Sequence, residues 1–408
     1  MDSRTAPAQT RALNHWRQAG LLLLGGVLLL GGGCVSFKRE PARPGRTTLE
    51  APLVLLPAEV IGNYLVVTTK WDRHGPYHFL IDTGASVTLV SPQLAARYPA
   101  KNAPPETIPQ VRVRSARGDI AVLPSTTLSR LQLGEAGFEN VKVLVYDCQP
   151  LSDHLGIQID GILGFPLFRE TLLTLDYPQS RVVLTPRGPD PLVPGQAIPF
   201  DSELRTPLIP IKVGDQELIA LIDSGSDAAL SLNPAGLQLD YVSAPRPGVL
   251  IGTLTGDHLQ EVARLRQSLT VGEYTVREPV VGLIDELTSI GGAVLRHFTV
   301  TFDQENNRVT FHRASREPIT LPARRSAGLS FTKTPAYWRV ASVVPDSPAQ
   351  SAGVRPGDIV SRINGETVAH WDFHRYEQLL STAAEISYSF LQGTRETART
   401  LPVFDLVP

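Results

Sequence analysis

The sequence predicts a mainly β protein, in which two pseudo-symmetric all-β lobes are followed by a small α/β domain. Three observations support this fold class. From about Glu50 the chain consists of short apolar and β-branched runs broken by Gly, Pro and Asn, with little helical periodicity. One ordered series of motifs then occurs twice between residues 50 and 315. After about Pro322 the pattern changes to strands mixed with short helices.

Length and composition allow two to three folded domains. The chain has 408 residues, of which 42 % are hydrophobic and 19 % charged, enough for a large core. Its formal net charge of −2, with no dense Lys or Arg cluster, argues against a nucleic-acid partner. Cys34 and Cys148 are too few for a disulfide framework or a cysteine zinc site. The histidines show no clear ligand pattern, since His370 and His374 fit the start of an amphipathic helix. We therefore predict no metal and no cofactor.

The amino terminus predicts export. The first 20 residues carry three arginines, and residues 21–33 form an apolar run that ends at Cys34. This run of 13 residues is shorter than the ~20 needed to span a bilayer. Its Gly-Gly-Gly-Cys ending resembles a bacterial lipoprotein cleavage box, although the usual aliphatic residue, Leu30, stands one place early. We expect an export segment over 1–34 that is lipidated at Cys34; an ordinary cleaved signal or an uncleaved anchor are the alternatives.

Lipidation would attach the mature protein to a membrane of the bacterial cell envelope, on the periplasmic side. Residues 35–49, rich in Pro and Arg, would then be a tether. Cys148 would be left without a partner and is expected to pack as a small apolar residue.

Two acidic turns are the strongest signal in the sequence. An apolar run leads into Asp82-Thr83-Gly84, and a second apolar run leads away. The same pattern returns at Asp223-Ser224-Gly225. Each reads as strand, tight turn and strand, with one carboxylate at the end of a buried strand.

The motifs around these turns are also duplicated, in the same order. A Gly-Glu turn follows an apolar run at 131–135 and again at 269–273, and each half closes on an apolar segment with a glycine. The last pair is a hairpin with an Asp and an Arg at identical spacing, in both halves. The closing glycines are Gly164 and Gly291, and the hairpin pairs are Asp176 with Arg181 and Asp303 with Arg308. Such a repeat predicts two lobes related by an approximate twofold axis, with one acidic turn on each side.

Together these motifs resemble the aspartic proteases. The paired Asp-[Thr/Ser]-Gly turns and the segment Asp160-Gly161-Ile162-Leu163-Gly164 are similar to those of pepsin-like enzymes, whereas the short lobes are nearer the retropepsin-like branch. The resemblance covers about residues 50–315 and implies a first lobe at 50–187 and a second at 188–315. Because both lobes lie in one chain, no dimer is needed to complete the site.

The resemblance implies that Asp82 and Asp223 are the catalytic residues. Two adjacent carboxyl groups cannot both ionise cheaply, so they share a proton; one activates water while the other acts as acid. This logic is that of the aspartic proteases themselves. The alternative is that each Asp merely caps its own turn.

Further residues are expected to support this dyad. Thr83 and Ser224 would lock the two turns together, and Gly84 and Gly225 would allow the tight turns and a close approach of substrate. The closing-strand residues Gly164 and Gly291 would pass beneath the turns without a side-chain clash.

Three other features have two interpretations each. Asp227 could form a salt bridge with Arg296, which we favour, or contact the substrate backbone. Gly118 and Gly256 lie in segments that could be hairpin flaps over a cleft, or ordinary surface hairpins. Neither segment carries the aromatic residue of the pepsin-like flap.

The C-terminal residues 322–408 resemble the PDZ domains of bacterial envelope proteases. The resemblance is carried by the string from Ala352 to Gly365, which reads as a helix end, a Pro-Gly turn, a strand and an Asn-Gly hairpin turn. A helix is expected over about 373–381. The resemblance implies a groove between this helix and the strand near Trp338, in which a C-terminal peptide would bind as an added strand. The expected Gly-rich carboxylate loop is not clean at 331–337, so a structural or autoregulatory role remains open.

The sequence therefore favours an exported aspartic endopeptidase that hydrolyses extended polypeptides, with a PDZ module for recruitment or regulation. A non-catalytic envelope polypeptide-binding protein is the main alternative, and an enzyme acting on another small substrate is a third. Nucleophilic Ser or Cys catalysis has no support, because the Gly-x-Ser-x-Gly motif is absent.

Overall fold

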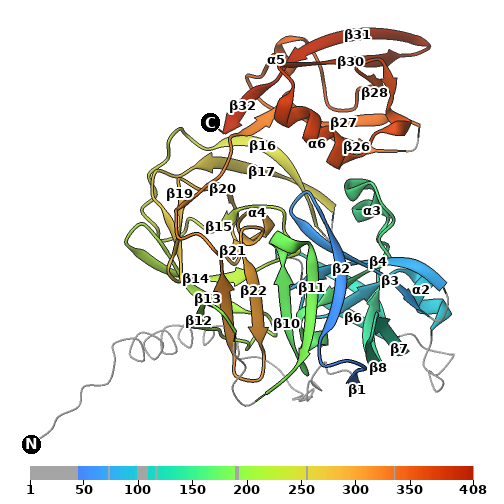
Figure 1. The fold of residues 1–408 in the computed structure, drawn as a ribbon. Coiled ribbons are helices and arrows are strands. Elements are labelled where there is room, and N and C mark those ends of the chain that lie inside the picture. The colour runs from blue at the N-terminus through green and yellow to red at the C-terminus, as the bar shows by residue number, and fades with distance from the viewer. Residues whose placement is uncertain are drawn as a thin grey trace, which may run out of the picture. The chain divides into compact units, whose positions relative to one another are not determined.

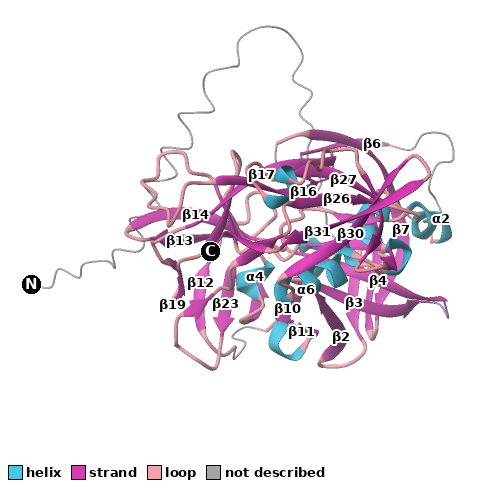
Figure 2. Cartoon of the chain, turned by 90° about the horizontal axis from the view of Figure 1, so that it is seen from above, coloured by secondary structure: helices cyan, strands magenta, loops and turns pink. Residues whose placement is uncertain are grey.

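The structure is a computed structural model that describes residues 45–71, 74–98, 109–114, 118–188, 193–253, 256–334 and 336–407. The expected export segment, with Cys34, and most of the expected tether lie outside the described residues. Within the described part, strands dominate and helices are short (Figures 1 and 2). None of the helices described is long and apolar enough to cross a membrane. The predicted mainly β fold class is confirmed.

The first lobe is built around two strands that deliver and support an acidic turn. Strand β4 runs parallel to β9, with Asp82 opposite Gly164, and β5 pairs antiparallel with β9 from the other side. The strands of this lobe are β1 (Arg46–Leu49), β2 (Val54–Ile61), β3 (Tyr64–Trp71), β4 (His74–Asp82), β5 (Thr88–Val90), β6 (Gln110–Arg114), β7 (Ile120–Leu133), β8 (Ala136–Val145), β9 (Gly161–Gly164), β10 (Thr171–Asp176) and β11 (Arg181–Pro186). Its α-helices are α2 (Pro92–Arg97) and α3 (Gln149–Leu155), with 3₁₀ turns η1 (Phe165–Phe168) and η2 (Tyr177–Gln179).

The second lobe repeats this arrangement. Strand β14 runs parallel to β21, and β15 pairs antiparallel with β21, just as β4, β9 and β5 do. Its strands are β12 (Gln196–Pro199), β13 (Leu208–Val213), β14 (Gln216–Ile222), β15 (Leu230–Leu232), β16 (Arg246–Thr253), β17 (Gly256–Arg264), β18 (Leu269–Val271), β19 (Tyr274–Arg277), β20 (Val280–Leu283), β21 (Ser289–Ile290), β22 (Thr299–Asp303), β23 (Arg308–His312) and β24 (Ile319–Thr320), and its helix is α4 (Gly292–Leu295). The sequence repeat therefore corresponds to a structural repeat.

A shared sheet joins the two lobes. Strand β10 of the first lobe pairs antiparallel with β22 of the second, and the two lie side by side in Figure 1. Thr174 and Thr301, which are equivalent in the repeat, face each other there, with their hydroxyl oxygens 2.9 Å apart. The strand order β12-β23-β22-β10-β11-β2 thus makes one sheet from both halves, with the pseudo-twofold axis between the two threonines.

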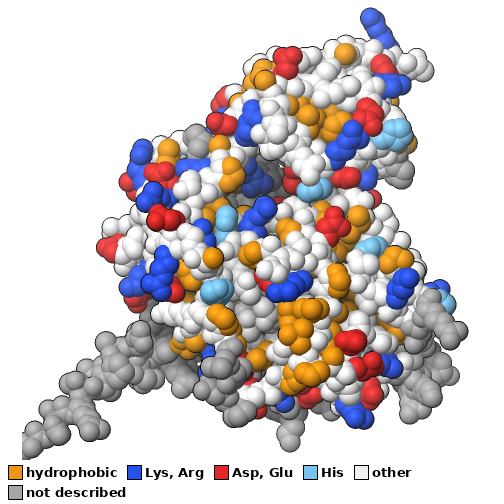
Figure 3. Space-filling view, in the orientation of Figure 1, with side chains coloured by type: hydrophobic (Ala, Val, Ile, Leu, Met, Phe, Trp, Pro, Cys, Tyr) orange, Lys and Arg blue, Asp and Glu red, His pale blue; other side chains and the backbone are white. Residues whose placement is uncertain are grey.

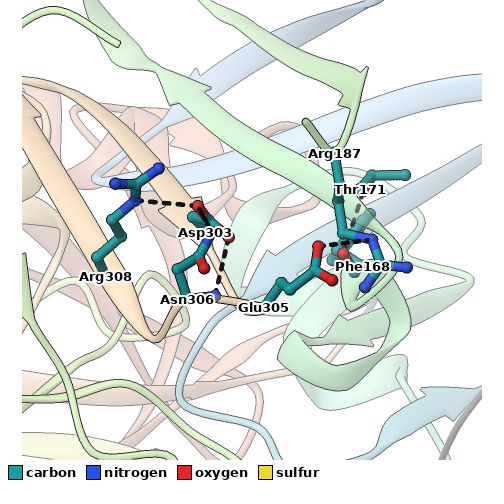
Figure 4. Close-up of polar contacts among 7 residues, drawn as sticks. All are labelled: Phe168, Thr171, Arg187, Asp303, Glu305, Asn306 and Arg308. Carbon is teal, nitrogen blue, oxygen red and sulfur yellow. Dashed lines mark hydrogen bonds and ion pairs between the residues drawn. The ribbon is translucent and has the colours of Figure 1, made fainter. Parts of the chain in front are cut away.

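The hairpins that contribute to this sheet carry matching ion pairs. Arg181 Nε donates to Asp176 Oδ2 at 2.7 Å, and Arg308 Nε donates to Asp303 Oδ2 at 3.0 Å. In Figure 4, Asn306 and Arg308 both point at Asp303, and these contacts lower the pKa of its carboxyl group. The identical spacing in the two sequence halves therefore closes the same turn twice.

One large apolar core extends through both lobes, and the first lobe has a second, smaller cluster. Phe165 of the first lobe packs edge-on against Phe302 of the second, with ring centroids 5.2 Å apart, and both rings are buried. On the face shown in Figure 3, basic and acidic side chains are interspersed. Continuous burial across the axis favours two lobes that fold as one body.

The C-terminal domain has its own core. Its strands are β25 (Arg324–Ser326), β26 (Leu329–Lys333), β27 (Trp338–Val343), β28 (Ile359–Ile363), β29 (Glu366–Thr367), β30 (Glu385–Gln392), β31 (Arg395–Pro402) and β32 (Phe404–Val407). Its helices are α5 (Pro348–Ser351), η3 (Val368–His370) and α6 (Phe373–Thr382). The expected helix at 373–381 is confirmed as α6. The expected Asn-Gly hairpin turn is also present, with φ of 49° at Asn364 and 79° at Gly365.

The position expected for the peptide groove needs a correction. Strand β27, which contains Trp338, pairs with both β26 and β28, so it has no free edge. Strand β26 is the end strand of this sheet. An added peptide strand could therefore pair with β26, but not with the strand at Trp338.

Gly164 offers a test of the strand crossing beneath the first acidic turn. A Cβ atom at this position would lie 2.4 Å from the Val87 carbonyl oxygen, which belongs to the backbone and cannot rotate away. We expect Gly164→Ala to lower the free energy of unfolding by about 1–3 kcal/mol, as overpacked sites do. Denaturant unfolding measures it. Gly188→Ala is the control, because nothing lies within 4 Å of its Cβ position. Equal stability of the two variants would contradict the close packing described.

Candidate active site

The first acidic turn holds its carboxylate with its own backbone. Asp82 ends β4, and the N–H groups of Gly84 and Ala85 donate to its Oδ1 at 2.8 and 2.9 Å. These contacts orient the carboxyl group away from the strand it terminates. They also favour its ionised form.

The second turn repeats the arrangement with one contact fewer. Asp223 directly follows β14, and the N–H of Gly225 donates to its Oδ1 at 3.0 Å. Its own backbone N–H donates to the Ile290 carbonyl at 2.9 Å, which fixes the turn to the closing strand. The second closing glycine, Gly291, lies equally tight, since a Cβ there would be 2.3 Å from the Ala228 carbonyl oxygen.

Thr83 and Ser224 connect the two turns by four reciprocal hydrogen bonds. Each hydroxyl accepts the backbone N–H of the other residue at 3.0 Å. Each hydroxyl also donates to a carbonyl of the opposite lobe: Thr83 to Ile222 at 2.6 Å and Ser224 to Ile81 at 2.8 Å. Both residues are fully buried. Every donor and acceptor is satisfied, so the network sets the position of one turn relative to the other.

This network brings the two carboxyl groups together. The Cβ position of Gly84 lies 2.5 Å from Asp223 Oδ1, and that of Gly225 lies 2.3 Å from Asp82 Cγ. The carboxyl groups of Asp82 and Asp223 are therefore adjacent, and the pKa of each depends on the other group. Each glycine thus leaves the space that the opposite aspartate occupies, and any side chain there would displace it.

The pair holds a proton well above the usual pH for a carboxyl group. Burial is the main cause, raising the pKa of Asp82 to about 6 against the opposing effect of its backbone N–H donors. Burial and then the charge of Asp82 raise the pKa of Asp223 well above its ordinary value. Because the two groups titrate together, the values belong to the pair, which retains one shared proton over a wide pH range.

The raised pKa of Asp82 gives a stability prediction. Its ordinary value is 3.8, so between about pH 4 and pH 6 the unfolded chain releases a proton that the folded protein keeps. The folded state therefore loses stability as the pH rises through this window. Asp82→Asn has no such titration and also removes the charge that raises the pKa of Asp223, so the variant should gain stability relative to the wild type between pH 3.5 and pH 7.

Denaturant unfolding of both proteins at the two pH values measures this gain. Taking the difference between variant and wild type cancels carboxyl groups with lowered pKa values, such as Asp303. A difference that does not change with pH would show that Asp82 is not protonated by burial.

The expected salt bridge between Asp227 and Arg296 is absent, and this interpretation was wrong. Arg296 donates instead to the Asn63 side-chain oxygen at 3.1 Å, and Asn63 Nδ2 donates to the Asp227 backbone carbonyl at 2.7 Å. Asn63 lies in the tight β2–β3 turn of the first lobe. Arg296 of the second lobe therefore pairs with the first lobe and not with Asp227. The motif Gly62-Asn63 is typical of such a turn, but nothing in it indicates a cross-lobe contact.

The two segments expected to be flaps or ordinary surface hairpins are both hairpins. Strands β6 and β7 pair through Arg114 and Ile120, and β16 and β17 pair through Thr253 and Gly256. Residues 115–117 and 254–255, at the tips, lie outside the described residues. Gly118, with φ of 84°, lies against Glu286 of the second lobe. Glu286 was not predicted from the sequence.

The thiol of Cys148 is not suited to nucleophilic catalysis. It is buried and free, and burial followed by the charges of Asp147 and Asp160 raises its pKa to about 12. A thiol of this kind stays protonated at neutral pH.

Two family comparisons agree with this site and with the C-terminal fold. Residues 67–167, which include the first acidic turn and its closing strand, match the family model for aspartyl protease. Residues 339–386 match the model for the PDZ domain. Two parts of the chain are thus similar to an aspartyl protease domain and to a PDZ domain. The protease match lies within the first lobe. A search among curated proteins found no match.

Proposed function

We propose that this chain is an aspartic endopeptidase that cleaves extended polypeptides by activating a water molecule between Asp82 and Asp223. One observation carries the proposal: each of two repeated turns places its glycine directly against the carboxyl group of the other turn, while buried donors and acceptors hold the turns together. Asp residues that only capped their own turns would have no need of this cross-lobe network.

Because the pair shares one proton, one carboxyl group can act as the base and the other as the acid. The ionised carboxylate accepts a proton from water, which attacks the scissile carbonyl carbon, while the protonated carboxyl group donates to the carbonyl oxygen. Asp82 is the better candidate for the base, since two N–H donors stabilise its carboxylate and only one stabilises that of Asp223. Asp82 then passes the proton taken from water to the leaving nitrogen. The C–N bond breaks, and a hydroxyl group of the intermediate returns a proton to Asp223, which leaves a carboxylic acid, an amine and the starting dyad.

The first flap hairpin supports a polypeptide substrate. It exposes three apolar side chains, with 39 % of Val111, 52 % of Ile120 and 56 % of Val122 accessible. Apolar side chains on an exposed strand pair are suited to hold an extended chain with apolar residues.

Digestion of an unfolded protein from pH 3 to pH 8 tests the activity. We expect internal cleavage products, identified by mass spectrometry, that are missing when Asp82→Asn replaces the wild type. If neither protein cleaves the substrate but both bind peptides, the result would instead support a non-catalytic polypeptide-binding protein. Equal cleavage by both would assign the activity to another site or a contaminant.

The PDZ domain would recruit polypeptides by adding their C-terminal residues to β26. Its sheet ends there, and Phe331 on this strand packs against Trp338 and Tyr376 in a rigid aromatic core. Fluorescence anisotropy of a labelled peptide library, with free and amidated C-termini, tests this role. Preference for free C-termini supports recruitment; binding of neither form leaves a structural or regulatory role.

Export to the bacterial cell envelope and lipidation at Cys34 are proposed from the sequence alone. Growth of producing cells with labelled palmitate should label the wild type but not Cys34→Ser. Fractionation then separates the remaining cases: a labelled membrane protein supports the lipid anchor, whereas an unlabelled soluble one indicates an ordinary cleaved signal.

A further inference from the structure

Three metal-ligating side chains from three parts of the fold meet at one point beside the dyad. His154 comes from α3 of the first lobe, Asp227 from the turn after Asp223, and Glu377 from α6 of the PDZ domain. One ligand atom from each lies within 4.8 Å of the other two. Residues so distant in sequence could not be recognised as one set from spacing.

The packing around the three residues is close and specific. Gly156, which ends α3, lies against Asp372 at the start of α6, so that a Cβ there would be 2.5 Å from the Asp372 side chain. His154 also contacts the Phe373 ring, with centroids 5.5 Å apart. The helix carrying Glu377 is therefore held next to the helix carrying His154.

The point where the three side chains meet is a cavity. It is small, with a volume of about 20 Å³, and is lined by the β2–β3 turn, α3, Asp227 and α6. His374 also lines it but is already engaged, since its Nδ1 accepts the Gly62 N–H at 3.3 Å and its other ring nitrogen pairs with Gln378 at 2.9 Å. The site thus offers three ligands and room for a water.

The two carboxylates of the cluster lie close to each other. Within the described residues, the carboxylates of Asp227 and Glu377 have no side-chain hydrogen bond and no ion pair with Lys, Arg or His. Two carboxylates within 4.8 Å of each other repel when both are ionised, so a bound cation would stabilise this arrangement.

We propose that His154, Asp227 and Glu377 bind one divalent ion of the zinc class, which links both protease lobes to the PDZ domain. Imidazole nitrogen and carboxylate oxygen are both zinc ligands, and sites with three protein ligands take water in the fourth position. Ligands at about 2.0–2.2 Å from Zn²⁺ lie about 3.4 Å apart in a tetrahedron, so small side-chain rotations would close the cluster.

This metal is a link rather than part of the catalytic step. Its ligands include Asp227, four residues after Asp223, and the PDZ helix α6, so binding would fix the PDZ domain next to the second acidic turn. The inference stands on the cluster alone and does not depend on the protease activity proposed above.

Zn²⁺ binding to the untagged, full-length chain tests the site. After dialysis against Zn²⁺, we expect about one equivalent per chain by elemental analysis, and X-ray absorption should show nitrogen and oxygen ligands without sulfur. Glu377→Gln and Asp227→Asn, which keep the size of the side chain, should each weaken binding at least tenfold in titration calorimetry. His154→Gln should do the same.

The matched controls are Glu385→Gln and His312→Gln, which alter exposed side chains outside the cluster and should bind as the wild type does. Hydrogen exchange gives a second measurement: removing Zn²⁺ with a chelator should raise exchange in α3 and α6 but not in β10 and β22. Absence of stoichiometric Zn²⁺, sulfur ligation, or unchanged affinity in all three ligand variants would overturn the proposal.

Discussion

Replacing either member of the dyad is expected to abolish peptide cleavage, with Asp82→Asn and Asp223→Asn each lowering kcat by at least about 10³-fold. The reason is the shared proton: an amide can neither accept a proton from water nor supply one to the carbonyl oxygen. The two substitutions should act as one unit, so that the double variant is no worse than either single variant. Rates on a single fluorogenic peptide measure the effect.

Two results make this prediction specific. Asp240→Asn removes an exposed carboxylate of the second lobe that pairs with Arg266, and should leave the activity unchanged. Retained folding of both dyad variants, shown by unfolding midpoints at least as high as the wild type at pH 7, separates lost chemistry from lost structure. If one dyad variant kept substantial activity, the two-carboxylate mechanism would have to be abandoned.

Gly225→Ala should be almost as damaging, although it changes no polar group. The added methyl would lie 2.3 Å from Asp82 Cγ and 2.5 Å from both its carboxylate oxygens. Either the methyl or the opposite aspartate must move by about an ångström, and errors of that size in a reacting group cost about 10²-fold. We expect kcat to fall by about a hundredfold or more while KM changes little.

Gly188→Ala again provides the comparison, because its Cβ position is open. A pH–rate profile adds information that a general loss of stability would not: a displaced dyad should titrate differently from the wild-type pair. A Gly225→Ala variant with the wild-type profile and rate would show that the two turns are farther apart than described.

The features that sequence reasoning located well are those with local and repeated patterns. The two acidic turns follow apolar runs of strand type, and the duplication places them symmetrically. The fold class and the neighbouring positions of Asp82 and Asp223 could therefore be predicted from the sequence alone. The helix at 373–382 was equally visible, because Phe373, Tyr376 and Leu380 share one face.

The features that were missed depend on contacts between distant elements. Arg296 was expected to pair with Asp227, but it donates a hydrogen bond to Asn63 of the other lobe instead. The cluster of His154, Asp227 and Glu377 spans more than 220 residues of sequence and has no motif spacing. The free edge at β26 follows from strand order, which periodicity does not reveal.

The strand pairing between β10 and β22 also determines whether the two lobes stay together after the chain between them is cut. The connection from Pro186 to Gln196 is a single covalent crossing between the halves, whereas five residue pairs join them through the backbone. A protease nick there should leave a two-chain molecule that survives gel filtration as one particle. By contrast, either half produced separately would present an unpaired backbone edge at that strand and should tend to aggregate.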